Sequence, residues 1–189
     1  MSKPVNANPL TDTTGAICGQ GQSGPIFFLV GSFDTAVRVR DKCVVPAGKV
    51  LFFPVVNGVD VHVPEDHLYT PRLVWDDLQV TNGFAVRSLF ATVDGKSVPL
   101  DPANNHFRAC AGPVRRCSAP AFSLTLPDKN LFVTPAAGKY RPAVADGYYL
   151  MLKPLPKGCH TITFGGAGHL NVDPTVDFTQ DTTYHLTVR

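Results

Sequence analysis

The segment "ADGYYLMLKPLPKGCHTITFGG", residues 145–166, decides the fold class of this chain. Its first part is an apolar run, a turn containing proline and glycine follows at 154–158, and its last part alternates apolar with polar side chains. Short runs of this kind, bounded by turn residues, are typical of β-strands. The segment therefore predicts two consecutive strands, 147–155 and 159–166, joined as a hairpin-like pair.

Two reactive side chains in this segment, Cys159 and His160, invite a catalytic interpretation. His160 stands two positions after Gly158, where a ring in many β-sandwich domains hydrogen-bonds back to the backbone across a corner. Strand alternation sends Cys159 to the opposite face, so the two neighbours cannot act as a Cys–His pair. We expect a structural corner at His160 rather than a catalytic site.

Similar strand patterns recur along the rest of the chain at short intervals. The expected strands cover 25–33, 35–45 (with Val37 and Val39 opposed to Arg38 and Arg40), 49–63, 117–130 and 182–189, and a hairpin with an Asp94–Gly95 turn covers 88–100. Pro54 indicates a bulge or a sheet edge within 49–63. In 182–189, the alternation places Tyr184, Leu186 and Val188 on one face. One helix is expected near 70–80, where Thr70 can cap and Pro71 suits the first helical position. The pattern predicts an all-β fold, an antiparallel β-sandwich or jelly roll with one short helix.

The domain organisation follows from length and local composition. The 189 residues suit one domain. Residues 1–25 are polar and rich in Gly, Pro, Asn and Thr, which predicts an extended N-terminal arm. Residues 26–189 are expected to form a single β-sandwich domain.

The charge pattern narrows the classes of partner. Charged residues make up only 17% of the chain and the net charge is +2, without a basic run longer than "VRR". We therefore expect no nucleic-acid partner. No apolar stretch reaches 18 residues, so no membrane span is expected.

Five cysteines bear on the cellular compartment. Four of them lie in Gly/Pro-rich, loop-like surroundings and lack CxxC spacing, which favours the disulfides Cys18–Cys43 and Cys110–Cys117 and leaves Cys159 over. Disulfides imply a secreted, extracellular protein, and this expectation assumes that a signal peptide has been removed ahead of Met1. A cytosolic protein with reduced thiols is the alternative.

The segment "VDVHVPEDH", residues 59–67, holds the densest cluster of metal-ligand types. Asp60 and His62 would share one face of a strand, with His67 close behind, and such a set can bind a divalent ion. No HExxH signature accompanies them, and a solvated loop explains the same residues. A metal-dependent hydrolase built on these three residues is therefore one of three functional hypotheses, although we expect no cofactor.

The hypothesis that we rank first is a non-enzymatic binding or surface module for polysaccharide or another cell-surface component. Its candidate ligand-binding residues are the aromatic side chains Tyr69, Tyr148 and Tyr149. Another hypothesis is a structural subunit of an extracellular layer or filament, in which the arm 1–25 mediates self-association by strand exchange.

Several blocks of the chain resemble a family of secreted, β-rich proteins from bacteria and some microalgae. The matching blocks are "GQSGPIFFLVG", "CVVPAGKVLFFPVVNGV", "TVDGKSVPL", "FSLTLPDKN", "ADGYYLMLKPLPKGCHTITFGG" and "TYHLTV". The family is largely uncharacterised, so the resemblance implies export and a compact β fold but no activity. Cys159, in place of a basic residue, and the segment "RACAGPVRRC" depart from the family pattern.

Overall fold

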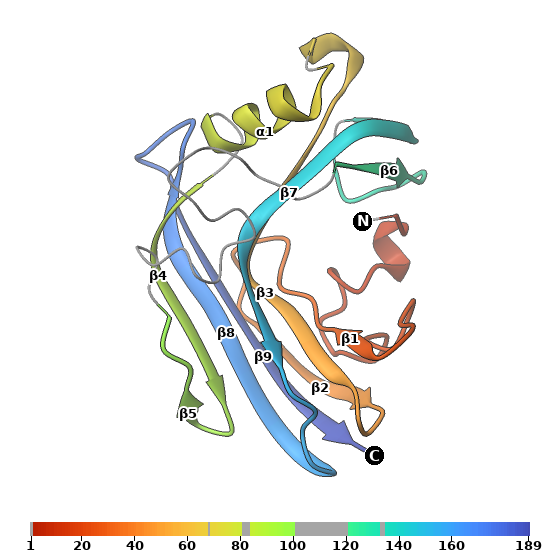
Figure 1. The fold of residues 1–189 in the computed structure, drawn as a ribbon, viewed down its shortest axis with the longest axis vertical. Coiled ribbons are helices and arrows are strands. Elements are labelled where there is room, and N and C mark those ends of the chain that lie inside the picture. Colours follow the sequence, from red (N-terminus) through yellow and green to blue (C-terminus); the bar gives the residue numbers. More distant parts are fainter. Residues whose placement is uncertain (1, 68, 81–83, 101–120, 133–134) are drawn as a thin grey trace.

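The computed structural model describes residues 2–67, 69–80, 84–100, 121–132 and 135–189, which form a sandwich of two β-sheets (Figure 1). The first sheet has the strand order β1 (Ile26–Phe28), β3 (Val50–Val61), β7 (Gly138–Leu152) and β6 (Phe122–Leu126). The second has the order β2 (Arg38–Val45), β9 (Asp177–Val188), β8 (Gly158–Leu170), β4 (Phe84–Val93) and β5 (Lys96–Ser97). Two 3-10 turns (η1, Val5–Ala7, and η2, Pro64–Asp66) and the helix α1 (Pro71–Val80) complete the described elements. The predicted mostly-β fold with one short helix is confirmed.

The sheets are mixed, and not purely antiparallel as the sequence suggested. β1 runs parallel to β3, and β2 runs parallel to the last strand, β9. The other pairings are antiparallel. Parallel neighbours need a long connection, and here the chain passes through the opposite sheet between β1 and β3. Both parallel pairs lie at a sheet edge and join segments that local pattern cannot connect.

The predicted hairpin within 145–166 is wrong, because its two strands belong to different sheets. β7 lies in the first sheet and β8 in the second, so the turn between them carries the chain across the sandwich (Figure 1). Leu155 in that turn packs against the core between the sheets. A strand whose apolar face is buried has the same sequence pattern whichever sheet it joins.

The corner at His160 is confirmed. One ring nitrogen, Nε2, lies 2.9 Å from the carbonyl oxygen of Pro156, and the other, Nδ1, lies 2.8 Å from Oδ2 of Asp94. Asp94 and Gly95 both have positive φ, as the predicted two-residue hairpin turn between β4 and β5 requires. His160 thus joins the β4–β5 hairpin to the crossover between the two sheets.

The main core lies between the two sheets. Phe53 of β3 packs on Phe164 of β8 with ring centroids 4.6 Å apart. Tyr184, Leu186 and Val188 point together into this core from β9, as the alternation in 182–189 predicted. Aromatic side chains at the centre of both sheets therefore hold the sandwich together.

Strand β2 presents the opposite face from the one expected. Val37 and Val39 are exposed, whereas Arg40 is only 1% exposed. The guanidinium of Arg40 donates to the carbonyl oxygens of Asp12, Val30 and Gly31 at 2.7–3.0 Å. Only the folded chain brings these three carbonyl oxygens together around the buried guanidinium. The alternation in 35–45 could not show this, and it therefore indicated the wrong face.

The N-terminal residues do not form the extended arm that was predicted. Val5 donates its backbone N–H to the carbonyl oxygen of Lys129, and the Arg40 bonds hold the chain near Asp12. Cys18 is joined to Cys43 of β2 by a disulfide with a Cα–Cα distance of 5.6 Å, which confirms that predicted pair. The N-terminal segment is therefore packed against the sandwich.

The other cysteine predictions have different outcomes. Cys159 is free and exposed, as expected. Cys110 and Cys117 lie outside the described residues, and their pairing stays a prediction.

Helix α1 forms as predicted and covers one end of the first sheet. The hydroxyl of Thr70 accepts the N–H of Leu73, so Thr70 caps the helix. Val74 and Leu78 are buried against Val144 of β7, and Figure 1 shows the helix lying across the ends of the strands. Within the described part of the chain, no helix has the length and apolar character needed to cross a membrane.

Candidate functional site

The candidate site is a cleft of about 300 Å³ beside the second half of β3. β1 pairs with β3 only from Val50 to Phe52, and no other described strand pairs with this edge of β3. The chain leaves the edge after β1 and passes through 32–35, which forms one side of the cleft. The opening exists because a three-residue strand covers the edge of a twelve-residue strand.

The backbone N–H and C=O groups of β3 point alternately toward β7 and toward the cleft, so one hydrogen bond to β7 shows which residues face the cleft. His62 donates its N–H to the carbonyl oxygen of Pro142 in β7, at 2.8 Å. The register between β3 and β7 is regular from Asn57 to Val61, and successive residues of a strand direct their N–H and C=O groups to alternate sides. The N–H and C=O groups of Asn57 and Val59 therefore face the cleft.

Two features close this stretch of edge at its ends. Pro54 has no N–H and introduces the bulge that follows it. At the other end, the N–H of Val61 is taken by the side chain of Asp60, at 2.8 Å. Between these ends, no described strand or loop group accepts a hydrogen bond from the N–H of Asn57 or Val59.

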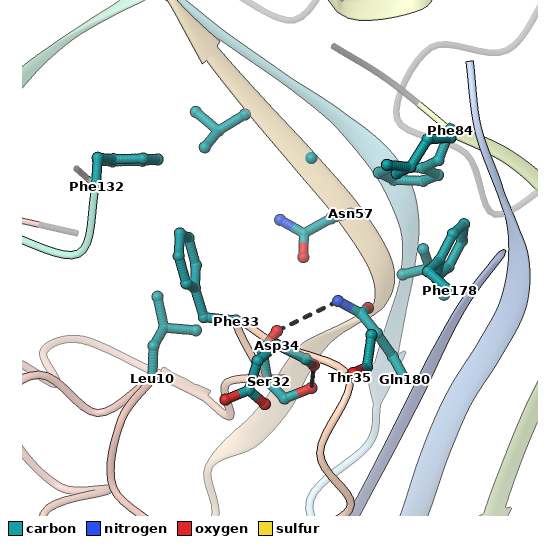
Figure 2. Close-up of a pocket in the computed structure, with 14 residues that line it drawn as sticks. Leu10, Ser32, Phe33, Asp34, Thr35, Asn57, Phe84, Phe132, Phe178 and Gln180 are labelled. Carbon is teal, nitrogen blue, oxygen red and sulfur yellow. Dashed lines mark hydrogen bonds between the residues drawn. The ribbon is translucent and has the colours of Figure 1, made fainter. Parts of the chain in front are cut away.

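Two aromatic pairs form opposite walls of the cleft (Figure 2). On one side, the rings of Phe33 and Phe132 meet edge to face, with centroids 5.6 Å apart. On the other side, the rings of Phe84 and Phe178 meet at 5.3 Å. Figure 2 shows Asn57 between the two walls. The side chain of Asn57 also hydrogen-bonds the hydroxyl of Tyr149, whose pKa burial raises.

One end of the cleft is polar. The hydroxyl of Ser32 donates to the carbonyl oxygen of Asp34 at 2.8 Å, and the amide of Gln180 donates to the carbonyl oxygen of Ser32 at 3.3 Å. The carboxylate of Asp34 pairs with Arg38 and accepts the N–H of Ala36. Among the described lining residues, Asp34 is the only one with an ionisable side chain. The hydroxyl of Ser32 is hydrogen-bonded to a backbone oxygen and not to a base, so the described lining contains no nucleophile–base pair around it.

The predicted metal ligands Asp60, His62 and His67 make other contacts in the structure and are not gathered into one group. Oδ1 of Asp60 accepts the N–H of Val61. His62 and His67 both lie beside the ring of Tyr69, at 5.1 and 5.8 Å between ring centroids, and Nδ1 of His67 is 2.8 Å from the hydroxyl of Tyr69. In the described ranges, no three His, Cys, Asp or Glu side chains gather into a metal-binding group. The structure gives the metal hypothesis no support.

The predicted tyrosines are not brought together. Tyr148 is buried in the core, and Tyr149 points to the other face, where it stacks on Phe52 at 5.4 Å. Tyr69 is exposed in the segment between η2 and α1. Phe28 meets Phe52 edge to face, so the rings on this face of the sheet do not make the flat platform that stacks on a sugar.

Sequence reasoning missed the four phenylalanines of the cleft. They come from four separate segments, and only the tertiary fold brings Phe33 to Phe132 and Phe84 to Phe178. One signal was available in the sequence, because Pro54 within the apolar run 49–63 indicates a bulge or a sheet edge. That interpretation is confirmed by the bulge and by the open edge beyond it.

Comparisons with known proteins add little to this geometry. No protein-family model matches the chain, and no curated protein matches it. One solved structure to which the chain has a distant likeness is that of PbICP-C in complex with falcipain-2. The sequences are 12% identical, the alignment covers 86% of this chain and 98% of that chain, and the TM-score is 0.32. A likeness this distant carries no argument about function.

Proposed function

We propose that this protein is a secreted, non-enzymatic binding module whose ligand site is the cleft beside β3. The observation that carries the proposal is the pair of aromatic walls facing each other across about 300 Å³ of space, with polar groups at one end. Ligand pockets typically combine aromatic walls with a few well-placed polar groups. The cleft thus suits a ligand with apolar groups at its centre.

The absence of catalytic groups in the described lining supports binding rather than catalysis. Asp34, its only ionisable residue, is already paired with Arg38. General acid–base chemistry needs a titratable group within hydrogen-bond reach of the substrate. A hydrolase site in this cleft is therefore not favoured.

The Cys18–Cys43 disulfide supports the secreted part of the proposal. Such bonds persist mainly in oxidising compartments. Self-association through a released N-terminal arm receives no such support, because the disulfide and Arg40 bind that segment to its own sandwich. We therefore retain a binding module and not an assembly subunit.

A titration followed by NMR tests the proposed site. Uniformly ¹⁵N-labelled protein would be titrated with short peptides, soluble oligosaccharides and small aromatic compounds. A ligand of the cleft should shift the amide signals of Asn57, Val59 and Gln180 in a saturable way. Shifts confined to another surface, or none with any class of compound, would contradict the proposal.

Two matched variants identify the walls. Phe33→Ala removes a cleft ring that is 43% exposed, and Phe28→Ala removes a ring that is 48% exposed and lies outside the cleft lining. We expect Phe33→Ala to weaken binding by about tenfold or more, since one lost aromatic contact is worth about 1–2 kcal/mol. Phe28→Ala should leave the affinity unchanged, and equal losses in both variants would place the site elsewhere.

A further inference from the structure

The open edge of β3 also indicates the chemical class of the ligand. Resting on the proposed function, we infer that the cleft takes an extended polypeptide segment of another protein. This segment adds to β3 as a new edge strand and places two adjacent apolar side chains between the aromatic walls.

The backbone of β3 supplies the first argument. The N–H and C=O groups of Asn57 and Val59 face the cleft at strand spacing, which is about 6.6–6.8 Å for two residues. A polypeptide in extended conformation presents complementary groups at the same spacing. Pro54 and the Asp60–Val61 bond close the stretch at its two ends. The edge therefore has room for a short strand of two or three paired residues.

β1 supplies the second argument, because the molecule already adds a strand to this edge. β1 pairs with Val50–Phe52 in parallel, and the N–H of Leu29 still donates to the carbonyl oxygen of Phe52 at 2.9 Å. The inferred ligand strand would lie in line with β1, beyond the Pro54 bulge. The interaction would thus continue a pairing that the fold itself uses.

The two walls supply the third argument. Adjacent residues of a strand point to opposite faces of its sheet. Phe132 packs with Val61 on the outer face of the first sheet. A Cβ atom at Gly58 would lie 3.0 Å from the Phe84 ring, which places Phe84 on the inner face. An added strand would therefore direct one side chain to Phe33 and Phe132 and the next to Phe84 and Phe178.

The cleft volume agrees with this occupant. A space of about 300 Å³ is at the small end for pockets that enclose a drug-sized molecule. Two adjacent apolar side chains on an extended backbone would fill it while the rest of the peptide stays in solvent. A sugar chain lacks the alternating N–H and C=O groups that the β3 edge matches.

The ligand side of the test uses peptides with modified backbones. The probes are acetylated, amidated hexapeptides Ser-Gly-X-Z-Gly-Ser, in which X and Z take every ordered pair of Val, Leu, Phe and Tyr. NMR titration selects the tightest pair. Two further copies of that peptide then carry one N-methyl group, either at X or at Z. Only one of these amides faces β3 in an added strand, so one copy should lose about tenfold in affinity and the other should retain it.

The protein side of the test removes one edge donor. Val59→Pro deletes the N–H that faces the cleft and leaves the bonds between β3 and β7 intact, as the native Pro54 does at an earlier edge position. Val59→Thr is the matched control, because it keeps the N–H and the branched shape. We expect about a tenfold loss of peptide affinity for Val59→Pro and little change for Val59→Thr. Thermal unfolding of both variants verifies that they fold, and if Val59→Pro does not, the N-methyl pair decides.

The outcomes separate this inference from the proposed function. Peptide binding that is lost in Phe33→Ala but insensitive to both N-methyl groups would overturn strand addition and keep the binding site. Cleft signals that respond to an oligosaccharide or a small aromatic compound, and to no peptide, would do the same. If no compound shifts the cleft signals, both statements fail.

Discussion

The two halves of β3 form a contrast within one strand. Its first half, residues 50–53, lies between β1 and β7, with Leu51 and Phe52 paired on both sides, and it contributes Phe53 to the main core. In its second half, the stretch from Asn57 to Val59 is paired with β7 alone, among the described strands, and lines the cleft. The first half contributes to the stability of the fold, whereas the second half leaves backbone groups and aromatic rings available to a ligand.

The difference arises from what covers each half. The N-terminal segment is held beside the first half of β3 by several contacts. These are the hydrogen bonds of Arg40, the Cys18–Cys43 disulfide, and Tyr184, on whose ring Arg40 lies. Tyr184 both donates to the carbonyl oxygen of Val30 and accepts its N–H, at 3.0 and 3.2 Å. The covering chain then turns away, so the second half keeps an open edge. Substitutions should accordingly affect stability in the first half and binding in the second.

The largest expected effect on the free energy of unfolding is that of Phe53→Ala, which we compare with Phe33→Ala. Phe53 is 0% exposed and packs on Phe164, so Phe53→Ala should lower the free energy of unfolding by about 3–5 kcal/mol. Phe33→Ala, at the half-exposed cleft wall, should lower it by about 1 kcal/mol or less. Urea unfolding followed by circular dichroism measures both, and similar losses would end the distinction between the two halves.

The disulfide should have the next largest effect. Cys18 and Cys43 are 25 residues apart, and closing such a loop restricts the unfolded chain, which is worth about 3 kcal/mol. The double variant Cys18→Ser/Cys43→Ser should lose that amount, and Cys159→Ser should lose none because Cys159 is free and exposed.

Intact-mass measurement after alkylation gives an independent result for the cysteines. Without reductant, Cys159 should be labelled while Cys18 and Cys43 are not. Labelling of Cys18 and Cys43 in the native, unreduced protein would refute the disulfide and the export argument that depends on it.

Replacing Arg40 should lower the free energy of unfolding somewhat less than removing the disulfide. Arg40→Met keeps the volume of the side chain but leaves the carbonyl oxygens of Asp12, Val30 and Gly31 without their donor. The expected loss is about 2 kcal/mol, measured by urea unfolding. Lys42→Met on the exposed face of β2 serves as the control and should be neutral within about 0.5 kcal/mol. An equally small change in Arg40→Met would show that the N-terminal segment is not held by this residue.

The smallest predicted effect concerns pH and the corner at His160. The hydrogen bond to Asp94 raises the pKa of His160 above its usual value of 6.5, and the hydrogen bond to His160 lowers the pKa of Asp94. While Asp94 is ionised, the His160 contribution to stability is therefore complete below pH 6.5 and is lost as the pH rises through the raised pKa. Asp94 is half exposed, which limits the pair to about 1 kcal/mol or less.

Urea midpoints measured on both sides of that transition test the pH effect. His160→Gln should lose stability relative to the wild type at low pH, and the difference should shrink at high pH. A His160→Gln difference that grows with pH would reverse the sign of the argument.

Local features of the fold were predictable from the sequence alone. The helix at Pro71–Val80, the Asp94–Gly95 turn and the corner at His160 are confirmed, because caps, turn conformations and side chain-to-backbone bonds depend on residues close in sequence. Strand alternation identified the buried face of β9 for the same reason.

Features that join distant segments were decided only by the tertiary structure. A period of two residues shows that one face of a strand is buried, but it does not name the sheet, the neighbour or the direction of pairing. The hairpin expected at 145–166 therefore became a crossover between sheets, and Arg40 found carbonyl acceptors inside the protein. The cleft belongs to the same class, because its walls meet only when β3, β4, β9 and two connecting segments pack together.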